Sequence, residues 1–247
     1  MPIDWRVQLY QSVETTQSYV KDAIASGEPE GVVVQALEQK SGKGRHGNVW
    51  NSPIGNLYMS VLLRPDCEAR DAGQLAFVVA VALSKALDDY IDEDKHKKTL
   101  KWPNDILVDG LKICGILLES EIKQNKTDAV IVGTGLNIFK APELAVGLND
   151  VSEIPVYVNT VRDNILDKLS YYYKFWQKKG FAPIREAWLK QAHGLDQPMS
   201  ARLPDKSEKG VFRGITDDGS LILETEAGEK IIHAAEVHFG PEAEETA

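Results

Sequence analysis

The dipeptide Asp109-Gly110, which lies between two apolar runs, constrains the fold of this chain more than any other feature. Residues 106–108 precede it and residues 111–119 follow it. Asp-Gly suits a tight type I′ turn because both central residues of that turn need a positive φ. We therefore predict an antiparallel hairpin in which the sheet holds Lys112 close to the turn.

Hydrophobic periodicity and capping residues predict the other elements before Gly194. Buried strands are expected at residues 32–34, 57–63 and 129–132, the last running into Gly133-Thr134-Gly135. A helix capped by Thr15 or Thr16 should end at Gly27, and a longer one should span residues 71–91. Further helices are expected from the cap Asn159 to residue 179, with Gly180 as the stop, and from Pro183 to residue 192.

The pattern changes after Gly194, where short β-type runs alternate with turn residues such as Asp217-Asp218-Gly219. Strands are expected at residues 199–203, 210–215, 221–224 and 230–233, and they predict a small all-β, barrel-like module. We expect an α+β chain with a larger domain at residues 1–192, a β-domain at 193–240 and a disordered acidic tail at 241–247.

Composition excludes several classes of protein. No apolar run reaches the roughly 18 to 20 residues that a membrane span needs, and the N-terminus shows no secretory signal, so we expect a cytoplasmic protein without a membrane partner. A net charge of −9 argues against nucleic-acid binding as the main activity. Cys67 and Cys114 are expected to be reduced thiols, and the five histidines show no metal-ligand spacing.

A glycine-rich basic loop, Gly42-Lys43-Gly44-Arg45-His46-Gly47-Asn48-Val49-Trp50, follows an apolar β-branched run. Glycines let the backbone present its N–H groups to an anion, and Lys43 and Arg45 add positive charge. A solvated turn explains such a loop equally well when it stands alone. Three later segments favour a binding site for a nucleotide and a small carboxylic acid: residues 101–105, 112–119 and 133–137.

In this order, the four segments resemble those of the biotin protein ligases, and Thr15-Thr16-Gln17 resembles the family's Ser-Thr-Asn stretch. The resemblance implies a mixed-sheet catalytic domain of the class II synthetase-like, biotin/lipoate ligase type, followed by an SH3-like barrel. It also implies that biotin and ATP, with Mg²⁺, give biotinyl-5′-AMP, whose biotinyl group passes to a lysine of a biotin carboxyl carrier domain of a carboxylase. The residues before Thr15 are too few for the winged helix of some relatives, so we expect a short form without a repressor role.

Site residues follow from the resemblance by position. Lys112 should bridge the biotin carboxylate and the α-phosphate, Arg45 should contact one of these anions, and Asp105 should help to accept a proton from the incoming lysine. The expected nucleotide contacts are Arg45, Trp50, Asn104, Asp105, Lys112 and Asn137, with Asn104 and Asp105 also near the magnesium. The expected biotin contacts are Thr15, Thr16, Gln39, Gly42, Lys43, Arg45, Lys112, Gly115 and Gly133, and Trp102 is a further candidate wall.

Simpler interpretations stand beside these. Thr15 can be a helix cap, Asn137 can bond local backbone, Gly133 and Gly135 can serve a bulge, and Cys114 is better explained as a packed side chain than as a nucleophile. The loop also departs from its family, because Lys43 replaces the usual arginine and His46 and Asn48 replace frequent basic residues. Lysine lacks arginine's bidentate fork, so we expect a looser hold on the adenylate.

Two other functions compete. A lipoate or octanoate ligase uses a related fold and the same acyl activation, but ordinarily carries a different glycine-rich signature. A non-enzymatic biotin sensor or interaction protein belongs to another class, and the combination of Lys112, Asn104 and Asp105 speaks against it. Family analogy also allows a homodimer, which nothing in the sequence specifies.

Overall fold

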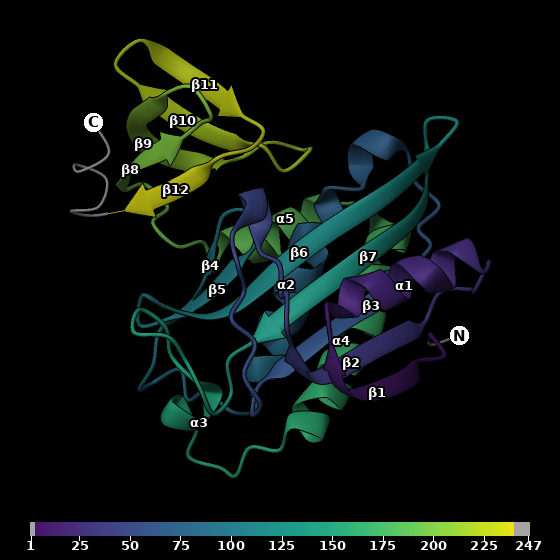
Figure 1. Cartoon of the computed structure of the whole chain (residues 1–247). Helices are drawn as coiled ribbons and strands as arrows, with labels where there is room; N and C mark the ends of the chain where they lie inside the picture. Colours follow the sequence, from purple (N-terminus) through teal and green to yellow (C-terminus); the bar gives the residue numbers. More distant parts are fainter. Residues whose placement is uncertain (1–2, 240–247) are drawn as a thin grey trace.

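The structure is a computed structural model that describes residues 3–239, and a seven-stranded mixed sheet forms its larger part (Figure 1). The strand order is β1-β2-β3-β7-β6-β5-β4, with β1 parallel to β2 and the remaining neighbours antiparallel. The strands are β1 (Arg6–Val13), β2 (Val32–Gln39), β3 (Leu57–Leu63), β4 (Lys98–Lys101), β5 (Asp105–Val108), β6 (Leu111–Lys123) and β7 (Lys126–Leu136).

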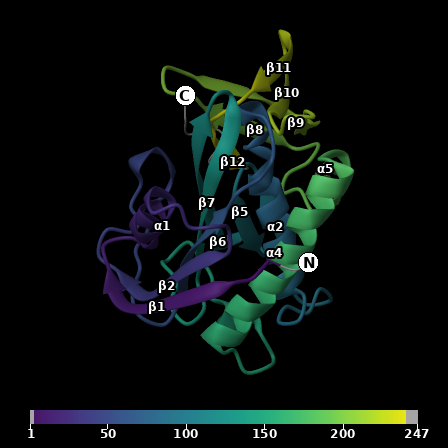
Figure 2. The ribbon, with the colours of Figure 1, turned by 90° about the vertical axis from the view of Figure 1, so that its right-hand side faces the viewer.

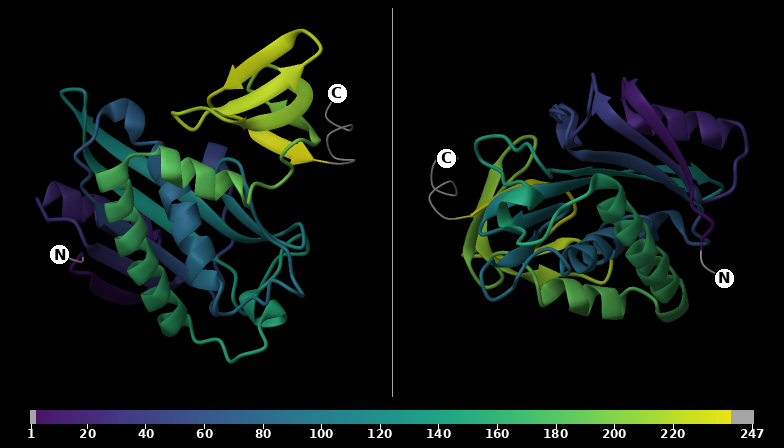
Figure 3. Two further views of the ribbon diagram at one scale, coloured as in Figure 1. Left: turned by 180° about the vertical axis from the view of Figure 1, so that it is seen from behind. Right: turned by 90° about the horizontal axis from the view of Figure 1, so that it is seen from below.

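Helices cover both faces of this sheet, as Figures 2 and 3 show from the side and from behind. One face carries α1 (Thr16–Ala25). The other carries α2 (Gln74–Leu87), α4 (Val158–Lys179) and α5 (Ala182–Leu189), and the short α3 (Leu148–Val151) lies in the connection between β7 and α4. No helix in the described part of the chain is long and apolar enough to span a bilayer.

Side chains of β7 point alternately to the two faces of the sheet, and its last residues form the floor of a pocket. Ala129 and Ile131 face α1 and pack in its small core, while Val130 and Val132 belong to the larger core under α2. With a period of two, the next residues on the α1 side are Gly133 and Gly135. An added Cβ would lie 3.3 Å from the Gln17 side chain of α1 at Gly133 and 2.5 Å from the Trp50 ring at Gly135. The glycines therefore make room on this face for the side chains of Gln17 and Trp50, which both line the pocket.

The predicted hairpin is confirmed. Asp109 and Gly110 have φ values of 52° and 82°, as a type I′ turn requires, and join β5 to β6. The register shifts once, so that Ile106 pairs with Cys114 and Leu107 with Lys112. Such a bulge redirects nearby side chains, and here it lies beside Lys112.

Several expected boundaries are wrong. The helix expected at residues 71–91 is limited to Gln74–Leu87, and the one expected to end at residue 192 stops at Leu189. Asn159 is no cap, because α4 begins at Val158 after Tyr157, and the Asn159 Oδ1 accepts from Arg162 instead. Strands β1 and β4 were not predicted from the sequence, because exposed side chains on β1 and the lysines of β4 hide the alternation.

The C-terminal module is all-β, as expected, but its five strands form an open antiparallel sheet and not a closed barrel. The order is β11-β10-β9-β8-β12, so β11 and β12 are the two edges. The strands are β8 (Pro198–Arg202), β9 (Ser207–Ile215), β10 (Leu221–Thr225), β11 (Gly228–Ile232) and β12 (Glu236–Phe239). The expected tail at residues 241–247 lies outside the described residues.

Two hydrogen bonds join this module to the β4–β5 connection and to α5 of the larger part. Trp102 Nε1 donates to the carbonyl oxygen of Gly219 at 3.0 Å, and Arg185 Nε donates to that of Ile215 at 2.6 Å. Gly219 has a φ of +88° and sits so close to Phe77 that an added Cβ would come within 2.5 Å of the ring. The β9–β10 turn therefore also packs against Phe77 of α2.

We predict that Gly219→Ala lowers the free energy of unfolding by about 2–5 kcal/mol, since backbone strain and overpacking against Phe77 add up. Gly228→Ala is the matched control: its φ is also positive, at +109°, but nothing lies within 4 Å of the added methyl group. Urea unfolding of both variants measures the difference. Equal destabilisation would show that the Phe77 contact contributes nothing.

Candidate functional site

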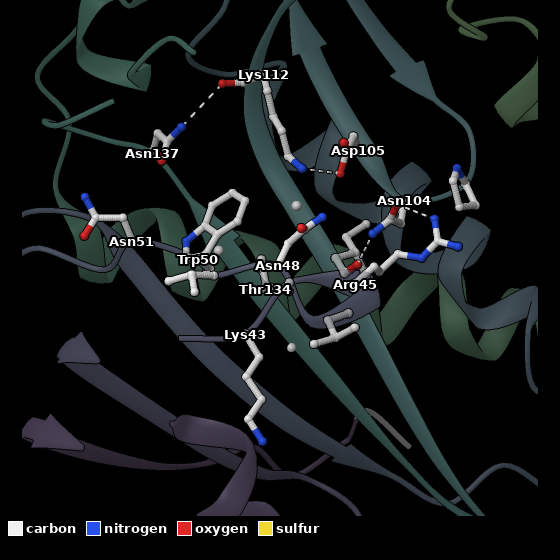
Figure 4. Close-up of a pocket in the computed structure, with 18 of the residues that line it drawn as sticks. Lys43, Arg45, Asn48, Trp50, Asn51, Asn104, Asp105, Lys112, Thr134 and Asn137 are labelled. Carbon is white, nitrogen blue, oxygen red and sulfur yellow. Dashed lines mark hydrogen bonds and ion pairs between the residues drawn. The ribbon is translucent and has the colours of Figure 1, made fainter. Parts of the chain in front are cut away.

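A cavity of about 370 Å³ lies between the glycine loop, the start of α1 and the glycines of β7, and Figure 4 shows residues that line it. Its size suits a small ligand. The structure gathers around it twelve of the thirteen residues expected to bind ligands: Thr15, Thr16, Gln39, Lys43, Arg45, Trp50, Asn104, Asp105, Lys112, Gly115, Gly133 and Asn137. Trp102 also lines this cavity, whereas Gly42 does not.

The glycine loop is a small hairpin that folds back on itself. Trp50 donates its N–H to the carbonyl of Gly42 at 2.9 Å, and Gly44 donates its own to that of Asn48 at 2.8 Å. A side chain at Gly42 would meet the Trp50 carbonyl at 2.3 Å, so this glycine is needed for the close approach of the two chain segments. Its role is to close the loop that presents Arg45 and Trp50.

Arg45 lies in a 3₁₀ turn and points into the cavity. Its Nη1 donates to Asn104 Oδ1 at 3.4 Å, while Asn104 Nδ2 donates to the carbonyl of Ile116. Burial lowers the pKa of Arg45, and the charges of Asp105 and Glu236 oppose that shift. The guanidinium is therefore a partly desolvated cation held by the sheet, which strengthens its attraction for an anion.

Lys112 and Asp105 face each other from the two strands of the predicted hairpin. The Lys112 Nζ lies 2.7 Å from Asp105 Oδ1 and 5.2 Å from the centre of the Trp50 ring (Figure 4). Trp50 in turn lies flat on the glycine floor, because a Cβ on Gly115 or Gly135 would come within 2.9 Å or 2.5 Å of its ring. The ammonium is thus positioned on one side by a carboxylate and on the other by an indole face.

Asn137 supports Lys112 through the backbone. Its Nδ2 donates to the carbonyl of Lys112 at 3.3 Å, and its own N–H donates to that of Ile113 at 2.9 Å. Asn137 therefore does bond local backbone, as the simpler interpretation held, and it also lines the cavity.

Neutral polar groups line the opposite end. Gln39 Oε1 accepts from the backbone N–H of Thr16 at 2.9 Å, and Thr16 Oγ1 is hydrogen-bonded to Ser60 Oγ at 2.7 Å. Gln39 Nε2 donates to Ser52 Oγ at 3.1 Å. These hydroxyls and amides can give and accept hydrogen bonds without adding charge, which suits an uncharged polar ring.

Sequence reasoning missed several lining residues. Gln17 is buried, and its Nε2 has no hydrogen-bond partner among residues 3–239. Ser60 sits in an apolar strand, where only its place in the folded sheet marks it. Residues 235–237 come from the C-terminal module. The helix and strand patterns do carry a signal for Gln17, since an amide at a buried position needs a partner.

The structure confirms some of the simpler interpretations and contradicts one. Thr15 is the N-cap of α1, accepting from the Gln17 N–H at 3.2 Å, and it lines the cavity as well. Gly133 and Gly135 lie in regular pairing with β6 and β3, so the bulge interpretation is wrong. Cys114 is fully buried, and burial raises the pKa of its thiol, as expected for a packed side chain.

No group of three or more His, Cys, Asp or Glu side chains in the described chain can hold a metal ion. Asp105 and Glu236 line the cavity separately. Such a site fits Mg²⁺ only when it is carried by phosphates, because Mg²⁺ commonly takes one or two protein carboxylates together with substrate oxygens and water.

Comparison with known proteins follows the same division of the chain. Residues 9–137 match the biotin/lipoate A/B protein ligase family, and residues 194–240 match the biotin protein ligase C-terminal domain. A biotin–[acetyl-CoA-carboxylase] ligase of Paracoccus denitrificans is 41% identical over 216 residues, which cover 84% of this chain and 90% of the relative. The bifunctional ligase/repressor BirA of Bacillus subtilis is 33% identical over 242 residues, covering 94% and 74%.

Solved structures agree with the fold. The biotin protein ligase from Aquifex aeolicus in complex with biotin and ATP superposes with a TM-score of 0.81 at 26% identity. The match covers 95% of this chain and 99% of the other.

We predict that alkylation at about pH 8 modifies Cys67 but leaves Cys114 unmodified until the protein unfolds, because only an accessible thiolate reacts. Burial raises both thiol pKa values, but Cys114 is also sealed from reagent. Mass spectrometry of peptides after iodoacetamide treatment, with Cys67→Ser as the control, measures this. Labelling of Cys114 at the rate of Cys67 would contradict the packing described.

Proposed function

Because the chain belongs to the biotin protein ligase family, we propose that it joins biotin to ATP as biotinyl-5′-AMP and then transfers the biotinyl group to a carrier lysine. The observation that carries the proposal is the pairing of a cationic end, with Lys112 and Arg45, to a neutral polar end within one cavity. Biotin has the matching character, with a carboxylate at one end and a ureido ring at the other.

The relatives favour biotin over the alternatives. The matched C-terminal family and the named relatives are biotin ligases, whereas the first matched family includes lipoate ligases as well. The presence of Lys112, Asn104 and Asp105 together in the cavity, with relatives that are named as ligases, favours an enzyme over a non-enzymatic sensor. We therefore propose biotin–[biotin carboxyl carrier protein] ligase as the activity.

In the first step, a carboxylate oxygen of biotin attacks the α-phosphorus of ATP, a new O–P bond forms, and the bond to the β-phosphate oxygen breaks to release pyrophosphate. Two anions must approach, and charge gathers on the phosphoryl oxygens. A unit charge ~4 Å away, at an effective dielectric near 20, contributes about 4 kcal/mol before desolvation is counted. We assign this role to Lys112, with Arg45 as a bidentate donor to the phosphate.

Mg²⁺ would neutralise part of the triphosphate charge, and Asp105 is the carboxylate that we assign to hold it together with the phosphates. Asn104 keeps Arg45 directed into the cavity through its Oδ1. Trp50 offers a flat apolar surface for adenine or for the biotin chain.

In the second step, the carrier lysine attacks the acyl carbon, the C–N bond forms, and AMP leaves with the former carboxylate oxygen. The lysine must lose a proton, and we assign Asp105 to receive it. Thr15, Thr16, Gln39, Gly115 and Gly133 are proposed to surround the biotin rings, and Asn137 to contact the nucleotide.

The acceptor is proposed to be the biotin carboxyl carrier domain of a carboxylase, as the names of the relatives suggest. Residues 1–192 are proposed as the catalytic domain and 193–240 as the C-terminal domain. ATP as a co-substrate and two free thiols support a cytoplasmic location, and light scattering would test for a homodimer.

We predict that Lys112→Ala reduces biotin-dependent exchange of labelled pyrophosphate into ATP by about 10²–10³-fold, because a fixed donor to the reacting oxygens is lost. Lys123→Ala is the control, since this lysine lies at the far end of the same strand in an exposed pair with Asp128. Undiminished exchange in Lys112→Ala would remove Lys112 from the mechanism. Absence of exchange in the unaltered protein would overturn the proposed function.

We predict that Lys43→Arg slows release of the adenylate a few-fold, because an arginine fork can make two parallel hydrogen bonds where lysine offers a point charge. The Lys43 side chain is exposed and extends away from Arg45 and Lys112 in Figure 4, so the effect should be modest. A chase of labelled biotinyl-5′-AMP measures the rate, with Lys40→Arg as the control. An unchanged rate would contradict the hypothesis that Lys43 makes the loop hold the adenylate less tightly than an arginine would.

A further inference from the structure

Asn56 is a buried asparagine next to β3 that lies outside the set of cavity-lining residues. It stands between two loops that flank the cavity: residues 51–56, which follow the glycine loop, and residues 137–147, which follow β7. Both loops contribute lining residues, Asn51 from the first and Asn137 from the second (Figure 4).

The side chain of Asn56 satisfies three consecutive backbone donors. Its Oδ1 accepts from the N–H groups of Ile138, Phe139 and Lys140 at 2.9, 3.1 and 3.1 Å. Its Nδ2 donates to the carbonyl of Lys140 at 2.7 Å. Four hydrogen bonds from one amide thus determine the course of the chain immediately after Asn137.

The same amide extends to the other loop. Asn56 Nδ2 also donates to Tyr58 Oη at 3.1 Å, and Tyr58 Oη donates to the carbonyl of Pro53 at 2.9 Å. Burial raises the pKa of Tyr58 to about 12, so the hydroxyl keeps its proton at any ordinary pH. The link between the two loops is therefore continuous and independent of pH.

The segment fixed by Asn56 forms the wall beside Lys112. Asn137 donates to the Lys112 carbonyl, and Val146 donates its N–H to the same carbonyl at 3.1 Å. Pro142 and Ala145, between these two points, line the cavity. If the chain at residues 138–140 were to shift, this wall and the Asn137 side chain would shift with it.

We infer that Asn56 is a positioning residue for ATP: it fixes Asn137 and the wall at Pro142 and Ala145 so that the nucleotide side of the cavity is formed before the ligand arrives. The inference rests on the proposed function. The direct hydrogen bonds of Asn56 to the backbone go to residues 138–140, whereas Thr16, Gln39 and Ser60 are bonded to one another and meet the 51–56 loop at the Gln39–Ser52 hydrogen bond. We therefore expect the larger effect of Asn56 on the nucleotide side.

The test compares, in Asn56→Ala, the catalytic efficiency with ATP and the binding of biotin. The pyrophosphate exchange assay gives kcat/KM for ATP, and calorimetric titration with biotin in the absence of ATP gives the dissociation constant and the stoichiometry. We expect kcat/KM for ATP to fall by at least about tenfold, since small displacements of positioning groups have large effects on rate. We expect the dissociation constant for biotin to change by less than about twofold, with the full number of binding sites retained.

Asn164→Ala is the matched control, because Asn164 Nδ2 likewise donates to a backbone carbonyl, that of Ala86 at 3.0 Å, and ties α4 to α2 away from the cavity. It should lower thermal stability without changing kcat/KM for ATP. Tyr58→Phe provides a second variant of unchanged shape if Asn56→Ala does not fold. It removes both hydrogen bonds of the Tyr58 hydroxyl, to Asn56 and to Pro53, and should reduce kcat/KM for ATP by a few-fold.

Two results would overturn the inference. One is an unchanged kcat/KM for ATP in both Asn56→Ala and Tyr58→Phe. The other is an equal loss of ATP activity and of biotin stoichiometry, which would show a purely structural role. Failure of the unaltered protein to catalyse biotin-dependent exchange would instead count against the proposed function, so the two failures are distinguishable.

Discussion

The site depends on one interaction, the contact of the Lys112 ammonium with the Asp105 carboxylate beside the Trp50 ring. The two residues belong to adjacent strands of one hairpin, so the Asp-Gly turn and the bulge beside it set their distance. A cation of this kind needs a neighbour that keeps it oriented and a space in front of it. Asp105 and the Trp50 face supply the first, and the cavity supplies the second.

The cavity is cationic although the protein as a whole carries a net charge of −9. Positive charge is concentrated at Arg45 and Lys112, and partial burial reduces its screening by water. Glu236 reaches the same cavity from the C-terminal module, so that module contributes to the electrostatics of the site. The hydrogen bonds from Trp102 and Arg185 explain why a separate sheet can do so: they fix it against the catalytic unit.

Local patterns allowed much of this to be predicted. The Asp109-Gly110 turn, the Thr15 cap and the Gly180 stop each depend on neighbouring residues alone, and the structure bears them out. The grouping of Arg45, Asn104, Lys112 and Asn137 required a family resemblance, because their meeting depends on strand order, which periodicity does not reveal.

Long-range contacts explain what was missed. Ser60 is recognisable as a lining residue only once β3 is paired with β7. Asn159 resembled a cap, but its side chain bonds Arg162 and the helix begins before it. The C-terminal strands have the spacing of a small barrel, yet closure depends on pairing between β11 and β12, which no local pattern reports.

The central claim is that Lys112 and Arg45 together hold the reacting acid and phosphate, and a crystal structure with a non-hydrolysable analogue of biotinyl-5′-AMP tests it most directly. The account predicts that the acyl-phosphate linkage lies within hydrogen-bonding distance of Lys112 Nζ and the Arg45 guanidinium, with the biotin rings towards Thr16 and Gln39. An analogue bound with its linkage away from both cations, or with the biotin rings at the Asn137 end, would contradict it.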